Sequence, residues 1–276
     1  MRRILLIPLA LTATSCADAQ SIHDRIYHPQ SAPLSVAGLP SGAALDQVRT
    51  ADGVLLGGVE VAGKADKPML LVFHGNAGSA TGTVAWFAPL VADGYGVVAA
   101  EYRGYSANPG RPDAKGLAAD ADAFYARAKA LAGTRRVIVV GHSLGGGVAF
   151  GLAMRQRLDA LVTVGTFTRL RDMVPKIARA FVPDDYDNLA AVPGLDEPYF
   201  LVHGTADDTV PAELGNDLHV AAAKAHKAGA SFVIAGAGHR PDGVVMAAVV
   251  DAIAAKVAGM PAPALPASVK VYPFDR

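Results

Sequence analysis

The feature that most constrains this chain is the alternation, after Pro68, of short uninterrupted apolar runs with longer helical stretches. A strand that is apolar at every position is buried on both faces, and helical crossovers join parallel strands. The sequence therefore predicts an α/β protein with a mostly parallel central sheet and helices on both of its faces. The expected strands are 69–73, 96–100, 136–140, 160–164, 199–202 and 231–235, and the expected helices are 83–92, 115–131, 145–157, 211–228 and 241–257.

Other segments flank this pattern. Residues 20–44 are polar and contain several prolines, which predicts an irregular arm. An Asp-Gly pair between 47–50 and 54–61 then predicts a leading β-hairpin. We expect one domain over 45–258, in which 167–192 lacks a strand pattern and forms a small helical cap. Residues 259–276 are rich in proline and alanine and are expected to form an extended tail, with a short strand at 269–272 as the alternative.

Composition and charge narrow the class of protein. The chain has 276 residues, of which 51% are hydrophobic, enough to bury one sizeable core. Its formal net charge is zero and it has no basic stripe, which argues against nucleic acid as a partner. The expected partner is a small-molecule or acyl substrate, and the sequence leaves the oligomeric state open.

The N-terminus resembles an export signal. A basic start precedes an apolar run at 4–11, which is far shorter than the roughly 20 residues that span a bilayer. Such a pattern is typical of a secretory signal peptide, here within 1–19. Cleavage before Cys16, as in a bacterial lipoprotein, competes with cleavage before Gln20. Cys16 is the only cysteine of the chain, which favours lipidation and a membrane tether. Either site predicts a protein exported to the periplasm or the membrane of a bacterium, and the alternative is a disordered terminus that is never exported.

The residues that carry chemistry begin with the segment Gly141-His142-Ser143-Leu144-Gly145. It follows a buried strand directly and opens a helix of small residues. A G-x-S-x-G element in this setting is typical of a nucleophile elbow, in which glycines let the strand and the helix approach closely. No Gly-Lys-Ser/Thr follows, which excludes a phosphate loop. Ser143 is therefore the predicted nucleophile.

A serine hydroxyl needs a base, and the base needs an acid to orient it. His239 follows the last predicted strand and precedes a helix, so it is the predicted base. Asp207 and Asp208 both follow the strand at 199–202, and either could be the acid. We favour Asp207, because Asp208 or Thr209 is well placed to cap the helix that begins near Pro211. The order serine, aspartate, histidine is that of proteins with this elbow.

A developing oxyanion requires two backbone donors. The N–H of Leu144, directly after Ser143, is the first. The second is expected from the loop after the strand at 69–73, where Asn76 is favoured over Ala77. The alternative is that this loop is only a tight turn. The predicted chemistry involves no metal and no cofactor.

Together these residues resemble the α/β-hydrolase superfamily over about residues 45–258. A narrower likeness is to small, nearly lidless serine hydrolases related to eukaryotic protein depalmitoylases and their bacterial counterparts. The segments that carry it are 26–30, 74–78, 101–105, 141–146, 167–172 and 203–207. The resemblance implies the α/β-hydrolase fold and cofactor-independent cleavage of esters or thioesters. Where that family usually reads Asp-Tyr-Arg-Gly-Tyr-Gly, this chain has Glu101 and Ser106 as the first and last residues, which is expected to bear on the pocket entrance.

The leading hypothesis is hydrolysis of a carboxylic ester or thioester. Ser143 attacks the carbonyl, His239 shuttles the proton, Asp207 orients His239, and water resolves the acyl-enzyme. A serine peptidase or amidase on the same residues is the alternative enzyme. A non-catalytic, surface-anchored binding protein is the alternative from another class. The sequence does not predict the acyl or leaving group, since specificity lies in 167–192 and in loops that it does not place.

Overall fold

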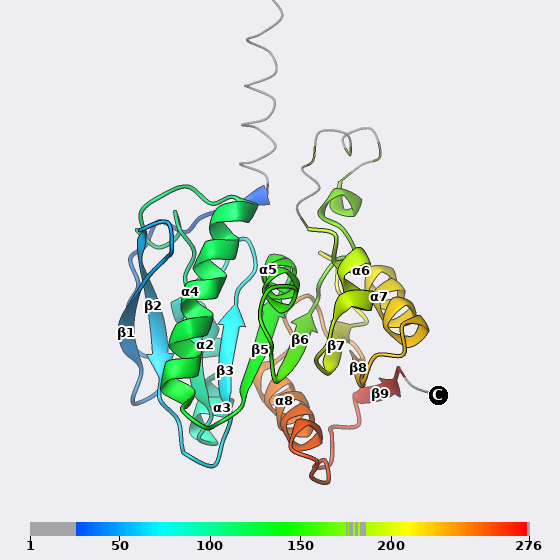
Figure 1. Ribbon diagram of the computed structural model, residues 1–276. Coiled ribbons are helices and arrows are strands. Elements are labelled where there is room, and N and C mark those ends of the chain that lie inside the picture. Colours follow the sequence, from blue (N-terminus) through cyan, green and yellow to red (C-terminus); the bar gives the residue numbers. More distant parts are fainter. Residues whose placement is uncertain (1–25, 175, 177–178, 180–181, 183–185, 275–276) are drawn as a thin grey trace, which may run out of the picture.

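The computed structural model describes residues 26–174, 176, 179, 182 and 186–274 (Figure 1). The predicted signal segment and Cys16 lie outside these residues. A single nine-stranded sheet in the order β1-β2-β4-β3-β5-β6-β7-β8-β9 runs through the molecule. The strands are β1 Ala44–Arg49, β2 Leu55–Val61, β3 Met69–Phe73, β4 Gly96–Ala100, β5 Val137–His142, β6 Ala160–Val164, β7 Tyr199–Gly204, β8 Gly229–Ile234 and β9 Val269–Pro273.

The strands from β3 to β8 pair in parallel, and every residue of β3, β4 and β6 is buried. Among the described strands, the antiparallel pairs are β1 with β2, β2 with β4 and β8 with β9, toward the two edges of the sheet. Burial on both faces explains why the apolar runs are uninterrupted, and it confirms the predicted fold class.

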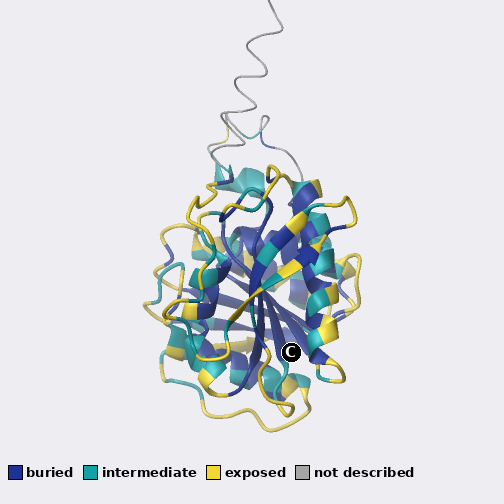
Figure 2. Ribbon diagram, turned by 90° about the vertical axis from the view of Figure 1, so that its left-hand side faces the viewer, coloured by how far each residue is buried: buried dark blue, intermediate teal, exposed yellow. Residues whose placement is uncertain are grey.

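Helices cover both faces of the sheet, and Figure 2 shows the buried strands between more exposed outer layers. The helices are α2 Ala80–Trp86, α3 Ala88–Ala92, α4 Ala114–Ala132, α5 Leu144–Ala153, α6 Asn188–Ala191, α7 Ala212–Lys224 and α8 Gly243–Val257. One apolar cluster packs α4, α5 and α7 on one face, and a second packs α2, α3 and α8 on the other. None of the helices in this described part is long and apolar enough to cross a bilayer.

Two expectations about the elements were wrong. The helix expected at 83–92 is two helices, which meet at Phe87. Pro89 causes the break, since it has no N–H to donate back to the preceding turn. The extended tail is also wrong for Val269–Pro273, which form β9 on β8, as the alternative had it. The predicted hairpin is present as β1 and β2.

The segment 167–192 contains no strand among its described residues, as its sequence pattern predicted. It holds a 3-10 turn, η1 Leu170–Met173, and the short helix α6, which a single bridge between Arg169 and Asp187 ties together. Another 3-10 turn, η3 Val192–Gly194, follows α6. The loops after β3, β5, β7 and β8 lie at the carboxyl edge of the sheet, where parallel α/β folds place their sites.

Candidate active site

Ser143 is the single residue between β5 and α5, and its backbone is strained. Its φ of 54° and ψ of −118° lie in a region that residues other than glycine seldom adopt. A Cβ on Gly141 would lie 2.4 Å from the carbonyl oxygen of Gly145, and one on Gly145 would lie 2.1 Å from that of Phe73. Glycine is therefore required on both sides of Ser143. The strand–turn–helix geometry expected of a nucleophile elbow is present.

Asp207 and His239 are in direct contact. The Nδ1 atom of His239 lies 2.9 Å from Oδ2 and 3.1 Å from Oδ1 of Asp207. Oδ1 also accepts the N–H groups of Thr209 at 3.0 Å and Val210 at 2.8 Å. Burial alone would raise the pKa of Asp207, but these hydrogen bonds hold it below its usual value. An ionised Asp207 keeps the hydrogen on Nδ1 and leaves Nε2 free to take a proton.

Asp208 does not have the capping role expected of it. Its side chain is exposed and, among the residues that the structure describes, accepts only the Thr209 hydroxyl, at 3.3 Å. The N-cap residue of α7 is Pro211, and no side chain caps that helix. The turn is stabilised by Asp207 itself, because its carboxylate accepts the N–H groups two and three residues ahead. The residue favoured as the acid is thus also the residue that fixes the loop.

Ser143 and His239 line one pocket of about 610 Å³, together with Gly75, Asn76, Ala77 and Trp86. Within the described ranges, the Ser143 hydroxyl makes no hydrogen bond to His239. The structure thus joins the predicted acid to the predicted base and brings the predicted nucleophile to the same pocket. Catalytic hydrogen bonds are often long in an unliganded enzyme and tighten when substrate binds.

The two predicted oxyanion donors lie close to Ser143: Leu144 directly follows it, and Asn76 lines the same pocket. Leu144 is the first residue of α5, so its N–H has no partner within the helix. Asn76 lies in the loop after β3 and lines the pocket. A Cβ on Gly75 would lie 3.2 Å from the Cβ of Ser143, so this loop passes directly beside the elbow. Neither N–H donates a hydrogen bond to any residue that the structure describes, which leaves both available to a ligand.

His142 has a larger part in the site than its place in the elbow motif suggested. Its Nε2–H donates to the carbonyl oxygen of His239 at 3.0 Å, and the two rings lie 4.7 Å apart. The Trp86 ring packs edge-on against it, with centroids 5.3 Å apart. Burial, and to a smaller extent the charge of His239, lower the pKa of His142, so its ring is neutral near pH 7. No sequence signal beyond its position pointed to this contact.

Arg240 is a pocket residue that the sequence analysis missed. Its guanidinium lies over the Trp86 ring, 4.9 Å from the centroid, and donates to the carbonyl oxygen of Gly82 at 2.7 Å. Asp and Glu are absent from the described residues that line this pocket, and Arg240 forms no ion pair with any of the described acids. Its place directly after His239 was the one available signal. The pocket wall therefore carries one unneutralised positive charge.

The comparisons with known proteins identify the fold and the family. The model of the alpha/beta hydrolase fold family matches residues 68–194. An uncharacterized protein of Mycobacterium tuberculosis is 35% identical over 236 residues, which cover 80% of this chain and 83% of that protein. The lysophosphatidylserine lipase ABHD12 of Danio rerio is 31% identical over 186 residues, covering 58% of this chain and 49% of its own length.

Solved structures share the fold at low sequence identity. An esterase of Pyrococcus furiosus superimposes with a TM-score of 0.58 at 19% identity, over 76% of this chain and 89% of its own. The esterase domain of a Rhodothermus marinus protein gives 0.61 at 18% identity, over 78% and 98%. The sheet order and the elbow define an α/β hydrolase fold. The chain belongs to the α/β-hydrolase superfamily.

Proposed function

We propose that this protein is a serine hydrolase that cleaves a carboxylic ester or thioester through an acyl-enzyme on Ser143. The observation that carries the proposal is the contact of 2.9 Å between His239 and Asp207 at the pocket that Ser143 also lines. In the first half-reaction, the Ser143 oxygen attacks the carbonyl carbon while Nε2 of His239 takes its proton. His239 then protonates the leaving group.

The second half-reaction repeats these steps with water. His239 takes a proton from the water, the hydroxide attacks the acyl carbon, and the proton returns to the Ser143 oxygen as the acid leaves. In both tetrahedral intermediates, the N–H groups of Asn76 and Leu144 would stabilise the oxyanion. Asp207 remains ionised throughout and stabilises the transient imidazolium.

A panel of p-nitrophenyl esters of increasing acyl length tests the proposal, with Ser143→Ala as the control. The wild type is expected to turn over at least one ester, and Ser143→Ala should lose at least about 1,000-fold in kcat. Aminoacyl anilides run beside the esters separate the peptidase alternative, which predicts a preference for the anilides. Equal turnover by both proteins would contradict the proposal, and turnover of neither class of substrate would favour a binding protein.

Arg240 favours substrates with an anionic group. It is the one unpaired charge among the described lining residues, and its contacts with Trp86 and Gly82 fix the guanidinium in place. A phosphate or carboxylate beyond the ester bond would form charge-assisted hydrogen bonds with it. The name of the relative ABHD12 states an anionic lysophospholipid as its substrate. We therefore include lysophospholipid-like esters as the second candidate class.

We also propose that the protein is exported, with Cys16 lipidated or the chain cleaved before Gln20. Both sites precede Ile26, the first described residue, so either cleavage leaves 26–30 in place. These residues contribute to the site, since the N–H of His28 donates to the carbonyl oxygen of Asn76 at 3.2 Å. The intact mass of the mature protein, with a diacylated Cys16 or an unmodified Gln20 terminus, tests this proposal. An uncleaved chain would contradict it.

A further inference from the structure

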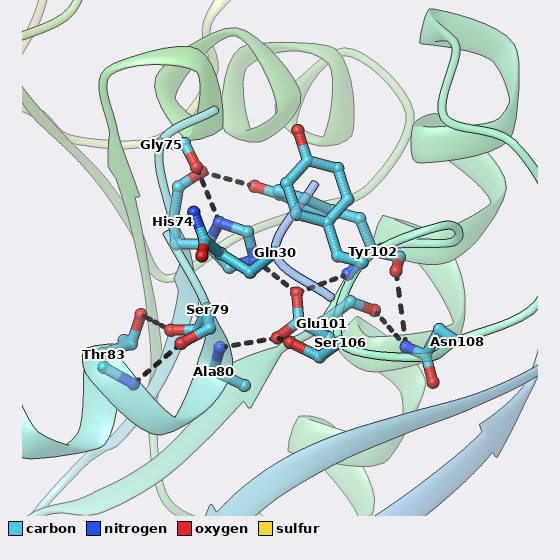
Figure 3. Close-up of polar contacts among 12 residues, drawn as sticks. Gln30, His74, Gly75, Ser79, Ala80, Thr83, Glu101, Tyr102, Ser106 and Asn108 are labelled. Atoms are coloured by element: carbon cyan, nitrogen blue, oxygen red, sulfur yellow. Dashed lines mark hydrogen bonds and ion pairs between the residues drawn. The ribbon is translucent and has the colours of Figure 1, made fainter. Parts of the chain in front are cut away.

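A buried carboxylate lies beneath the predicted oxyanion loop (Figure 3). Glu101 directly follows β4, the neighbour of β3, and its side chain is fully buried. Its two oxygens accept hydrogen bonds from Tyr102 N at 3.2 Å, Ala80 N at 2.9 Å and Ser106 Oγ at 2.8 Å, and one of them shares a hydrogen with His74 Nε2 at 2.7 Å. Glu101 and Ser106 were expected to bear on the pocket entrance. That expectation was wrong, because both are buried behind the loop and bond to each other.

The donors and acceptors around this pair fix where hydrogens lie. The Nδ1 atom of His74 is 2.7 Å from the carbonyl oxygen of Gly75, which can only accept, so Nδ1 carries a hydrogen. The N–H group of Ala80 can only donate to Glu101. The bond of 2.7 Å between Nε2 of His74 and Oε1 of Glu101 must then contain one further hydrogen. Whichever atom holds it, the imidazole and the carboxyl group together are neutral overall.

This pair acts on the peptide unit that carries the predicted donor. The carbonyl oxygen of Gly75 and the N–H of Asn76 belong to the same peptide bond, and the described chain contains no cis peptide. In a trans peptide the N–H points opposite to the C=O. His74 holds the Gly75 oxygen on the buried side, and the N–H of Gly78 also donates to that oxygen, at 3.0 Å. The N–H of Asn76 is thereby directed to the opposite side of the peptide from the Nδ1 atom of His74, and Asn76 and Ser143 line the same pocket.

Other contacts of the loop act on different groups. The Tyr102 hydroxyl donates to the carbonyl oxygen of His74 at 2.8 Å, and the Tyr105 hydroxyl donates to that of Asn76 at 2.8 Å. Both restrain the loop, but neither contacts the peptide between Gly75 and Asn76. Among these side chains, His74 alone orients that peptide, and Glu101 is its partner on the other ring nitrogen.

We propose that Glu101 is a positioning residue that aims the Asn76 N–H at the oxyanion by way of His74. Ser106 completes the arrangement, because its hydroxyl occupies the second carboxylate oxygen together with Ala80. Ser106 has an unfavourable backbone φ of 47° in this arrangement. The inference rests on the proposed function, since it requires an oxyanion to form at Ser143. The proposal gives one shared role to Glu101 and Ser106, the two residues that differ from the family motif.

The test compares Glu101→Leu with Glu101→Gln in the full-length protein. Leucine keeps the volume but leaves Nε2 of His74 without its partner. Glutamine can donate to a neutral His74 and still accept from Ala80. We expect Glu101→Leu to lose about 10- to 100-fold in kcat at nearly constant KM, because oxyanion donors act in the transition state. Glu101→Gln should stay within about fivefold of wild type. Asp120→Asn, which changes another fully buried carboxylate, is the control for lost stability and should leave kcat unchanged.

Comparing an ester with its sulfur analogue gives a ratio of rates that does not depend on how much of the variant is folded. A thionoester places sulfur where the oxyanion would form, and sulfur accepts hydrogen bonds poorly. The ratio of kcat/KM for the ester and its thionoester should therefore fall about tenfold in Glu101→Leu. An unchanged ratio in a folded variant would overturn the inference. If Glu101→Leu does not fold, Ser106→Ala decides in its place: a ratio reduced about two- to fivefold supports the inference, and an unchanged ratio overturns it.

Ser143→Ala, assayed alongside, keeps the two claims apart. If Ser143→Ala remains active, the proposed function fails whatever the Glu101 variants do. If Ser143→Ala is inactive while Glu101→Leu keeps the wild-type kcat and ratio, only the positioning role fails.

Discussion

The Nε2–H of His142 donates to the carbonyl oxygen of His239 at 3.0 Å, and the two imidazole rings lie 4.7 Å apart. The residue before the predicted nucleophile thus supports the loop that carries the predicted base. His142 is the last residue of β5, whereas His239 lies in the loop after β8, so this contact links two separate elements of the site. Either the neutral or the charged ring could donate this hydrogen bond. Burial disfavours the charged ring, however, and so lowers the pKa of His142.

His142 should therefore make stability depend on pH. Its pKa falls from 6.5 to about 3 in the folded protein, first through burial and then through the nearby His239. Between these values the unfolded chain binds a proton that the folded chain does not, so the free energy of unfolding decreases as the pH falls. We expect wild type to lose more stability than His142→Phe between pH 7 and pH 5. Urea unfolding at both pH values measures this, and equal losses would contradict the buried, neutral ring.

Asp207 and Asp208 form a natural matched pair. Asp207→Asn should lower kcat by about 1,000-fold or more, because an amide no longer selects the tautomer of His239. Asp208→Asn should remain within about twofold of wild type, since Asp208 is exposed and its one side-chain hydrogen bond within the described part of the chain is to Thr209. Steady-state kinetics with one ester separate the two. A larger loss for Asp208→Asn would show that the wrong carboxylate was assigned.

Gly165, directly after β6, lies beneath the contact between acid and base. A Cβ there would lie 3.0 Å from His239 Nδ1 and 3.1 Å from Asp207 Oδ2, at a φ of 54°. Gly133 has a similar φ of 60° with no atom within 4 Å of such a Cβ. Alanine should cost both positions about 1 kcal/mol of stability through the backbone. Only Gly165→Ala should also lose at least about tenfold in kcat, because it displaces the contact between His239 and Asp207 that the proposed mechanism requires.

If only Gly165→Ala loses activity while thermal unfolding shows similar stability for both variants, the Asp207–His239 contact is catalytically important. Equal activities would contradict that importance.

The strands were predictable because strands that are buried on both faces consist of consecutive apolar residues. All residues of Met69–Phe73 and Ala160–Val164 are buried, so a continuous apolar run identified each strand. The elbow was predictable for a related reason, since the turn at Ser143 needs glycine two residues before and two residues after it. Strand β9 gave a weaker signal, because at the edge of the sheet Val271 and Tyr272 are 41% and 38% exposed. Its stability comes from pairing with β8, which a local pattern does not record.

The contacts around the site were less predictable, because they join residues that are distant along the chain. His74 and Glu101 meet only because β3 and β4 are neighbours in the sheet. The support that His142 gives His239 requires β5 and the loop after β8 to converge. The sequence identified each segment as a motif, but side-chain partners depend on the sheet order. The role of Asp207 in its own turn was local and could have been inferred from its position.

Arg240 should affect substrate choice more than the chemical step. Arg240→Gln is expected to lower kcat/KM for an ester with a distal phosphate or carboxylate by about tenfold, through lost charge-assisted hydrogen bonds. Turnover of a neutral ester of equal chain length should change by less than about twofold. Added salt should reduce the wild-type preference for the anionic ester, since screening weakens exposed charges. Equal effects on both esters would contradict a role in selecting anions.

Covalent capture of Ser143 tests the central claim most directly. A fluorophosphonate reacts with a serine that a neighbouring base activates, and peptide mass spectrometry locates the adduct. Wild type should gain one adduct, on Ser143, whereas Ser143→Ala should gain none and His239→Ala should react at least about 100-fold more slowly. An adduct on another residue, or equal labelling of wild type and Ser143→Ala, would contradict the account.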